Sequence, residues 1–233
     1  MSALIEGGEG RRGLWRIAGI LAIAHVVLML SGFSLQKVAT VGSAPGAYIA
    51  AYIDGPLTQR LAGGCLACAS FLVFLLAATL FARLLRSRSE LGNWWASTVA
   101  ASGAIYVAIN LAVALPGVAA AVYDGHHGAS VAIVTALSDL HYFATFASMA
   151  VLGVFTVALA AAARTSAALS RWVAYSGYAA GSLCLVAVPG AGLGLVDDAM
   201  LVWMIWFIVT GVAALRRARS VPVQARAAAA AAS

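Results

Sequence analysis

The sequence predicts an all-α fold, a polytopic membrane helix bundle. Hydrophobic residues make up 63% of the 233 residues and charged residues only 9%, whereas soluble domains carry about 25% charged residues. Apolar runs of roughly 18 or more residues recur along the chain, which is the length that membrane helices need. These runs lack the strict alternation of membrane β-strands. A helix bundle is therefore the predicted fold class.

Six membrane spans are expected, because six apolar segments approach the roughly 20 residues that cross a bilayer. They cover about 14–35, 61–82, 95–118, 139–163, 172–193 and 199–215. Together they form one transmembrane domain, 14–215, between a short N-terminal segment, 1–13, and a basic, alanine-rich tail, 216–233. The longest loop, 37–60, is expected to carry a short surface helix in its middle.

Both termini are predicted to be cytoplasmic, because basic residues are concentrated in alternate loops. Twelve of the fourteen Lys and Arg residues fall on the side of the termini: Arg11, Arg12, Arg16, Arg83, Arg86, Arg88, Arg164, Arg171, Arg216, Arg217, Arg219 and Arg226. Only Lys37 and Arg60 fall on the outer side. The net charge of +6 therefore reflects cytoplasmic loops beside a lipid bilayer, and nucleic acid is not an expected partner.

The stretch LSDLHYFATFASMAVLGVF, residues 137–155, places Asp139 and His141 at the start of the expected fourth span. Asp139 lies 25 residues before Arg164, which is about 37 Å of helix, whereas the hydrocarbon core is about 30 Å thick. We therefore expect Asp139 at the outer boundary, where it caps the start of the helix. His141 points about 200° away from it. The two residues are a polar rim or part of a ligand pocket.

The outer loops hold a second group of acids and histidines. The segment DGHHG supplies Asp124, His126 and His127, and Asp197 and Asp198 precede the last span. Imidazole and carboxylate groups are ligands for zinc, nickel or copper(II). No diagnostic spacing such as HExxH is present. This group is either a metal site or a set of solvated loop residues.

His25 and Asn110 are polar residues within apolar segments. His25 lies nine residues beyond Arg16, about 13 Å into the membrane, and an ionisable residue at that depth suggests function. It is a haem ligand, a proton relay, or a neutral ring that donates to a backbone carbonyl or to a polar side chain such as Asn110 or Ser70. Asn110 either joins helices by hydrogen bonds or lines a pocket.

Cys65 and Cys68 form a C-x-x-C pair on one face of the second span, near its outer end. Quinone-coupled thiol oxidoreductases of membranes use such a pair, but they also need cysteines in an outer loop. The surrounding GGCLACAS is rich in small residues, which favours close helix packing. The two cysteines are therefore redox candidates, with packing as the favoured interpretation.

Two similar segments, VALPGVAAAVYD and VAVPGAGLGLVD, place Pro116 and Pro189 near the outer ends of two spans. Either helical hairpins were duplicated or the similarity reflects an Ala- and Val-rich composition. Each proline lacks an N–H, so a carbonyl one turn earlier needs another partner. Both prolines are candidates for lining a ligand pocket.

The chain resembles the actinobacterial membrane proteins grouped as domain-of-unknown-function family 4386. The resemblance rests on four segments in order, WRIAGILAI, ARLLRSRSELGNWW, ALSRWVAYSGYAAG and VWMIWFIVTGVAAL, together with the long outer loop. It implies a small multi-pass protein of the bacterial plasma membrane, and it carries no catalytic motif onto this chain.

The sequence contains no assembled catalytic set, and three functions stay open. The first is a membrane protein that binds or senses a small apolar or cationic ligand at its outer face, or acts as a partner subunit. The second is a membrane enzyme, either a haem or quinone oxidoreductase using His25 or an isoprenoid cyclase using Asp139 and Asp54 as acids. The third is a small secondary transporter, which would need to form a homo-oligomer to enclose a path.

Overall fold

The structure is a computed structural model that describes residues 2–36, 55–87, 89–190 and 194–220. Its helices are α1 (Ser2–Gln36), α3 (Leu57–Leu84), α4 (Glu90–Ile109), the π-helical turn η1 (Asn110–Ala114), α5 (Leu115–His126), α6 (Val131–Ser166), α7 (Arg171–Ala187) and α8 (Leu195–Ser220). The described residues contain no β-strand. The prediction of an all-α fold is confirmed.

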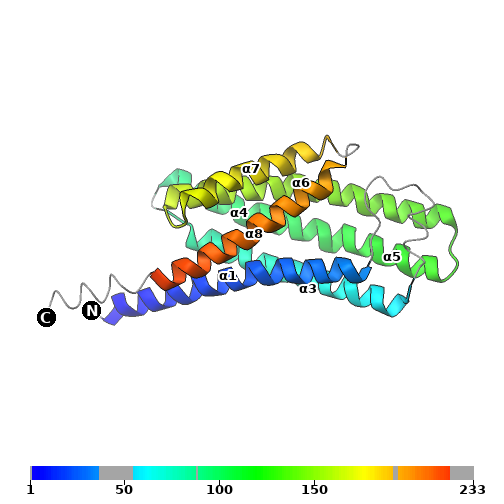
Figure 1. The fold of residues 1–233 in the computed structure, drawn as a ribbon, viewed down its shortest axis with the longest axis horizontal. Helices are drawn as coiled ribbons and strands as arrows, with labels where there is room; N and C mark the ends of the chain where they lie inside the picture. The colour runs from blue at the N-terminus through cyan, green and yellow to red at the C-terminus, as the bar shows by residue number, and fades with distance from the viewer. Residues whose placement is uncertain (1, 37–54, 88, 191–193, 221–233) are drawn as a thin grey trace.

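The helices form an elongated bundle of antiparallel rods (Figure 1). One of these rods is the continuous run of α4, η1 and α5, which extends from Glu90 to His126. The first residues of α1 and the last residues of α8 lie at the same end of the bundle (Figure 1). The opposite end carries the start of α3 and the turn between α5 and α6.

Five of the described helical segments are long and apolar enough to cross a membrane: Gly10–Gln36, Leu57–Leu84, Glu90–His126, Val131–Ser166 and Leu195–Ser220. The remaining helix, α7, has 17 residues and ends at Ala187, whereas the sequence suggests a span over 172–193. Pro189 lies beyond its last residue, in the turn that leads to α8. Membrane crossing by α7 therefore stays a prediction.

Helix α6 begins earlier than the sequence suggests. It starts at Val131, and Ser130 occupies the N-cap position. Asp139 is therefore in the third turn of α6 and does not cap its first N–H groups, because those belong to the first turn alone. The expected surface helix of the long loop and most of the C-terminal tail fall in 37–54 and 221–233, outside the described residues.

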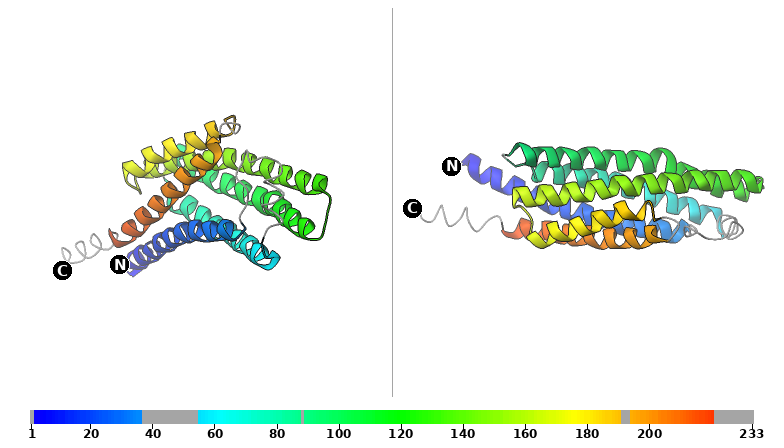
Figure 2. Two further views of the ribbon diagram at one scale, coloured as in Figure 1. Left: turned by 45° about the vertical axis from the view of Figure 1, so that its right-hand side comes forward. Right: turned by 90° about the horizontal axis from the view of Figure 1, so that it is seen from above.

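Glycines allow pairs of helices to approach closely. A Cβ atom on Gly19 of α1 would lie 2.6 Å from the carbonyl oxygen of Gly211 on α8, and the two helices pack against each other (Figure 2). Gly32 of α1 and Gly63 of α3 meet in the same way, since a Cβ on Gly63 would lie 2.7 Å from the Gly32 oxygen. Small residues at such crossings are typical of helix packing in membranes.

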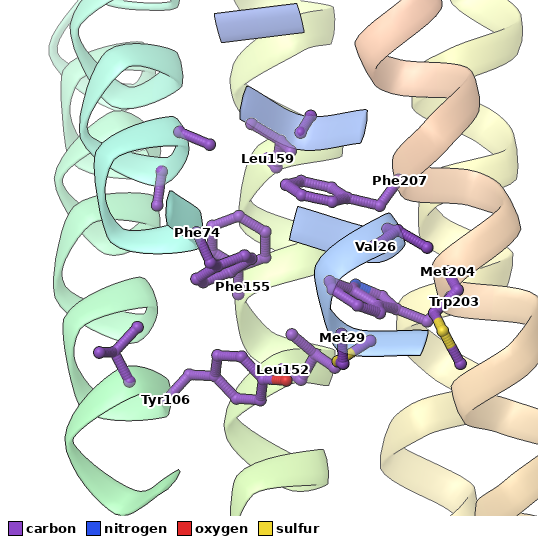
Figure 3. Packing of buried hydrophobic residues seen from close by; sticks show 14 of the residues in the cluster. Val26, Met29, Phe74, Tyr106, Leu152, Phe155, Leu159, Trp203, Met204 and Phe207 are labelled. Atoms are coloured by element: carbon purple, nitrogen blue, oxygen red, sulfur yellow. The ribbon is translucent and has the colours of Figure 1, made fainter. Parts of the chain in front are cut away.

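Aromatic side chains fill the centre of the bundle (Figure 3). Phe74 of α3 lies with its ring centroid 4.9 Å from Phe155 of α6 and 5.5 Å from Phe207 of α8. Trp203 stacks on Phe207 at 5.1 Å. Tilted and edge-on pairs of this kind stabilise a core beyond their buried area. The aromatic cluster thereby joins helices that are far apart in the sequence.

Candidate functional site

His25 lies within this aromatic cluster and is fully buried. Its ring centroid is 4.9 Å from that of Phe74, 5.8 Å from Trp203 and 5.9 Å from Phe207. The Nδ1–H of His25 donates a hydrogen bond of 2.8 Å to the carbonyl oxygen of Ser70. Because a carbonyl oxygen only accepts, Nδ1 is the nitrogen that carries the proton.

The packing around His25 favours the interpretation as a hydrogen-bonded core residue. The neighbouring aromatic rings occupy the space that a haem plane would need beside an axial ligand. Two buried ring nitrogens, His25 Nε2 and Trp203 Nε1, have no hydrogen-bond partner among the described residues. This unsatisfied pair lies at the aromatic centre, remote from the ends of the helices.

The π-helical turn η1 widens the rod that contains α4 and α5 directly before Pro116. The N–H of Leu115 donates to the carbonyl oxygen of Asn110, five residues earlier. The Asn110 side chain is buried and donates from Nδ2 to the carbonyl oxygen of Tyr106 at 2.8 Å. A proline ring clashes with the preceding turn of a regular α-helix, so the wider turn lets the helix continue through Pro116.

His141 binds to this irregular segment from the neighbouring helix. Its Nδ1 donates a hydrogen bond of 2.8 Å to the carbonyl oxygen of Ala114, the last residue of the π-helical turn. Asp139, two residues earlier on α6, is exposed. The structure therefore separates the two residues, as their angular spacing on a helix predicts. His141 fixes the junction of η1 and α5 against α6.

A pocket of about 450 Å³ opens between α3 and α5 at the end of the bundle remote from the termini. Its apolar wall combines α3 residues with residues in the π-helical turn and in α5: Leu61, Gly64, Leu111, Leu115, Pro116, Ala119 and Val122. We call this the α3–α5 pocket. Its volume is within the range of about 300–1,000 Å³ that small-molecule sites occupy.

Polar groups converge on one side of the α3–α5 pocket. Gln36, the last residue of α1, is 4% exposed, and its Oε1 has no hydrogen-bond partner among the described residues. Arg60 is also 4% exposed and donates from one terminal nitrogen to the carbonyl oxygen of Gln36 at 2.8 Å. A buried acceptor without a donor costs free energy. The pocket is thus apolar along most of its wall, and one of its lining residues, Gln36, holds an unsatisfied acceptor that is enclosed in this structure.

Three residues that the sequence singles out line the α3–α5 pocket, namely Cys65, Cys68 and Pro116. The cysteine pair faces this space from α3, with Cys65 exposed and Cys68 partly buried. Pro189 does not share the environment of Pro116, because it is exposed in a turn after α7. The similar segments around the two prolines therefore adopt different local structures.

The acids and histidines of the outer loops remain dispersed. Both ring nitrogens of His126 contact backbone carbonyl oxygens, at 2.8 Å from Val122 and 3.0 Å from Gly55. His127 stacks on Tyr123 with 4.2 Å between ring centroids. Asp124 lies in the last turn of α5, whereas Asp197 and Asp198 lie in the first turn of α8. Among the described residues, no three His, Cys, Asp or Glu side chains are grouped to hold a metal ion.

Sequence reasoning missed Gln36 and gave Arg60 no role beyond the charge balance of the loops. The two residues end and begin helices on either side of the longest loop, so nothing in their spacing indicates contact. The signal that could have found them is position: Gln36 is the last residue of α1 and Arg60 lies in the first turn of α3, and a long polar side chain near the end of an apolar helix faces either solvent or a pocket.

No protein-family profile, curated protein or solved structure matches this chain significantly. The resemblance to the actinobacterial membrane family stays a prediction.

Proposed function

We propose that this protein binds a small apolar molecule carrying a hydrogen-bond donor, such as a hydroxyl group, in the α3–α5 pocket. The observation that carries the proposal is an apolar cavity lined by Gln36, a residue whose enclosed Oε1 has no hydrogen-bond partner among the described residues and would reach the cavity after rotation of the amide group. A ligand hydroxyl would supply the missing donor, and its apolar body would cover the wall around Pro116. Ligand sites commonly combine an apolar lining with a few placed polar groups.

The chemistry of the pocket distinguishes between the two ligand classes that the sequence leaves open. The guanidinium of Arg60 lies beside the cavity and carries a positive charge, since arginine is not deprotonated in proteins. No acidic side chain lines the pocket among the described residues, so a cationic ligand would lose its hydration there without gaining a counter-charge. An apolar ligand is therefore the class that the α3–α5 pocket favours.

We also propose six membrane crossings in a bacterial plasma membrane, with both termini in the cytoplasm. The antiparallel rods and the Arg-rich loops at the end that bears the termini support this placement, because cytoplasmic loops are enriched in Lys and Arg. The α3–α5 pocket then opens at the outer leaflet, from which an apolar molecule can enter.

Thiol alkylation tests the proposal, because Cys65 and Cys68 line the pocket. A Cys184→Ser variant in lipid nanodiscs leaves these two as the sole thiols of the chain. We expect dodecanol to slow their reaction with N-ethylmaleimide more strongly than dodecane, which lacks the hydroxyl. Native mass spectrometry of the protein from mild detergent then identifies the natural ligand by its mass.

Two phenylalanine substitutions separate the pocket from general effects of a hydrophobic additive. Ala119→Phe fills the cavity from α5, so dodecanol should no longer slow alkylation in this variant. Ala104→Phe adds the same side chain at an exposed position of α4 and should preserve the protection. Equal protection in both variants, or equal protection by dodecane and dodecanol, would overturn the proposal.

A further inference from the structure

We propose that a second site, the cleft between α1 and α8, binds an anionic phospholipid. The cleft has a volume of about 660 Å³ and lies where residues 12–20 of α1 approach the last turns of α8. Three arginines from the two helices line it, Arg12, Arg16 and Arg219, together with the apolar residues Ile20 and Leu215. We call it the α1–α8 cleft.

The charges in the α1–α8 cleft are unbalanced. Arg12 donates from Nε to the carbonyl oxygen of Ala218 at 2.9 Å. In the part of the chain that the structure describes, Arg16 and Arg219 make no ion pair or hydrogen bond, and no acid lines the cleft. Three like charges around one space repel each other, and an anion placed between them relieves this repulsion. Guanidinium groups suit phosphate in particular, because they bind two of its oxygens at once.

The cleft changes from cationic to apolar along α1. Ile20 lies eight residues beyond Arg12, about 12 Å along the helix, and remains 51% exposed. The close approach of Gly19 and Gly211 limits the cleft at this depth. This order of groups matches a phospholipid, whose phosphate lies at the membrane surface and whose acyl chains lie deeper. A free phosphate ion would use only the arginine side chains.

The position of the α1–α8 cleft agrees with membrane electrostatics. Basic pockets between membrane helices on the cytoplasmic side bind anionic headgroups, and nearby Lys and Arg residues strengthen such binding. The inference rests on the membrane placement indicated by the five apolar helices. It is independent of the α3–α5 pocket, which lies at the opposite end of the bundle. An experiment that refutes ligand binding at one site therefore leaves the proposal for the other site intact.

Native mass spectrometry with the full chain in mild non-ionic detergent tests the inference. We expect one phosphatidylglycerol molecule to stay bound per chain, and we expect this lipid to raise the thermal unfolding midpoint. Phosphatidylcholine and inorganic phosphate should do neither. The double variant Arg16→Gln/Arg219→Gln should lower the affinity for phosphatidylglycerol by about 25-fold, since each basic side chain near an anionic lipid contributes about fivefold.

A matched variant provides the control for net charge. Arg216→Gln/Arg217→Gln removes the same charge from the same end of α8, but these residues line a different groove, beside α7. This variant should keep its affinity for phosphatidylglycerol within about twofold, while the unfolding midpoint without lipid reports on folding for both variants. Equal losses in the two double variants would overturn the inference in favour of diffuse attraction. Equal stabilisation by inorganic phosphate would overturn it in favour of an adventitious ion only.

Discussion

Two residues with unsatisfied buried atoms illustrate how the surroundings of a side chain decide its role. His25 Nε2 and Gln36 Oε1 both lack hydrogen-bond partners among the described residues. His25 is enclosed by packed aromatic rings, whereas Gln36 borders a cavity large enough for a ligand. An unsatisfied atom in a dense core is a cost of packing. An unsatisfied atom on a side chain that lines a cavity can instead meet a ligand once the side chain rotates.

The stability of two His25 variants should reflect this difference. His25→Leu keeps most of the side-chain volume and removes the unsatisfied nitrogen, so we expect its unfolding free energy to stay within about 1.5 kcal/mol of the wild type. His25→Ala leaves a cavity among the aromatic rings and should cost about 2–4 kcal/mol. Equilibrium unfolding in mixed micelles measures both. A loss in His25→Leu as large as in His25→Ala would contradict the core role.

Gln36→Leu should affect ligand binding and leave folding intact. The substitution removes the acceptor that we assign to the ligand hydroxyl and keeps the pocket apolar. We expect dodecanol to protect Cys65 and Cys68 with an affinity about 5- to 100-fold lower, which is the usual range for one lost hydrogen bond in a buried site. The midpoint of alkylation protection gives this affinity. Unchanged protection by dodecanol would remove Gln36 from the site.

At the scale of the helix, the π-helical turn and Pro116 depend on each other. Deletion of Ala112, an exposed residue of this turn, should convert η1 to a regular α-helical turn. The ring of Pro116 would then clash with the preceding turn, at a cost of about 3 kcal/mol. Pro116→Ala in the same chain should restore most of that stability. Thermal unfolding of the single and double variants measures the coupling, and additive effects would argue against it.

The crossing of α1 and α8 supplies a second prediction about helices. Gly19→Ala places a methyl group against the backbone of Gly211, so we expect it to cost about 1–3 kcal/mol of stability. Gly10→Ala, on the same helix, meets no atom within 4 Å and should stabilise α1 by about 0.5–1 kcal/mol. Unfolding in mixed micelles distinguishes them. Equal changes in the unfolding free energy of the two variants would show that the close contact between Gly19 and Gly211 does not contribute to stability.

The sequence alone predicts features that depend on local composition, but not features that depend on contacts between helices. The all-α fold follows from apolar runs, which depend on composition along the chain, and the buried state of His25 and Asn110 follows from their place within those runs. The α3–α5 pocket does not follow, because it needs a one-residue bulge before Pro116 and contacts among Gln36, Arg60 and α5. Local periodicity indicates which face of a helix is apolar, but not which helices meet at that face.

At the scale of the whole molecule, the number of membrane crossings depends on helix α7. Its 17 residues span about 26 Å, slightly less than the roughly 30 Å of the hydrocarbon core. Trp172, at its start, is 83% exposed, and tryptophan is enriched at membrane interfaces. A bilayer accommodates a short helix by local thinning at modest cost. The position of Trp172 and the antiparallel course of α7 between α6 and α8 therefore favour a crossing.

Labelling of single cysteines in a cysteine-free background decides the number of crossings. With six crossings, a membrane-impermeant maleimide should label His127→Cys on intact cells, whereas Ser170→Cys and Ser220→Cys should react only after permeabilisation. The three positions lie in the α5–α6 turn, before α7 and at the end of α8. If α7 does not cross, α8 carries Ser220 to the outer side, and Ser220→Cys reacts on intact cells while Ser170→Cys does not. An inverted pattern at all three positions would keep six crossings but reverse the orientation, and the arginines would then contradict the rule that places basic loops in the cytoplasm.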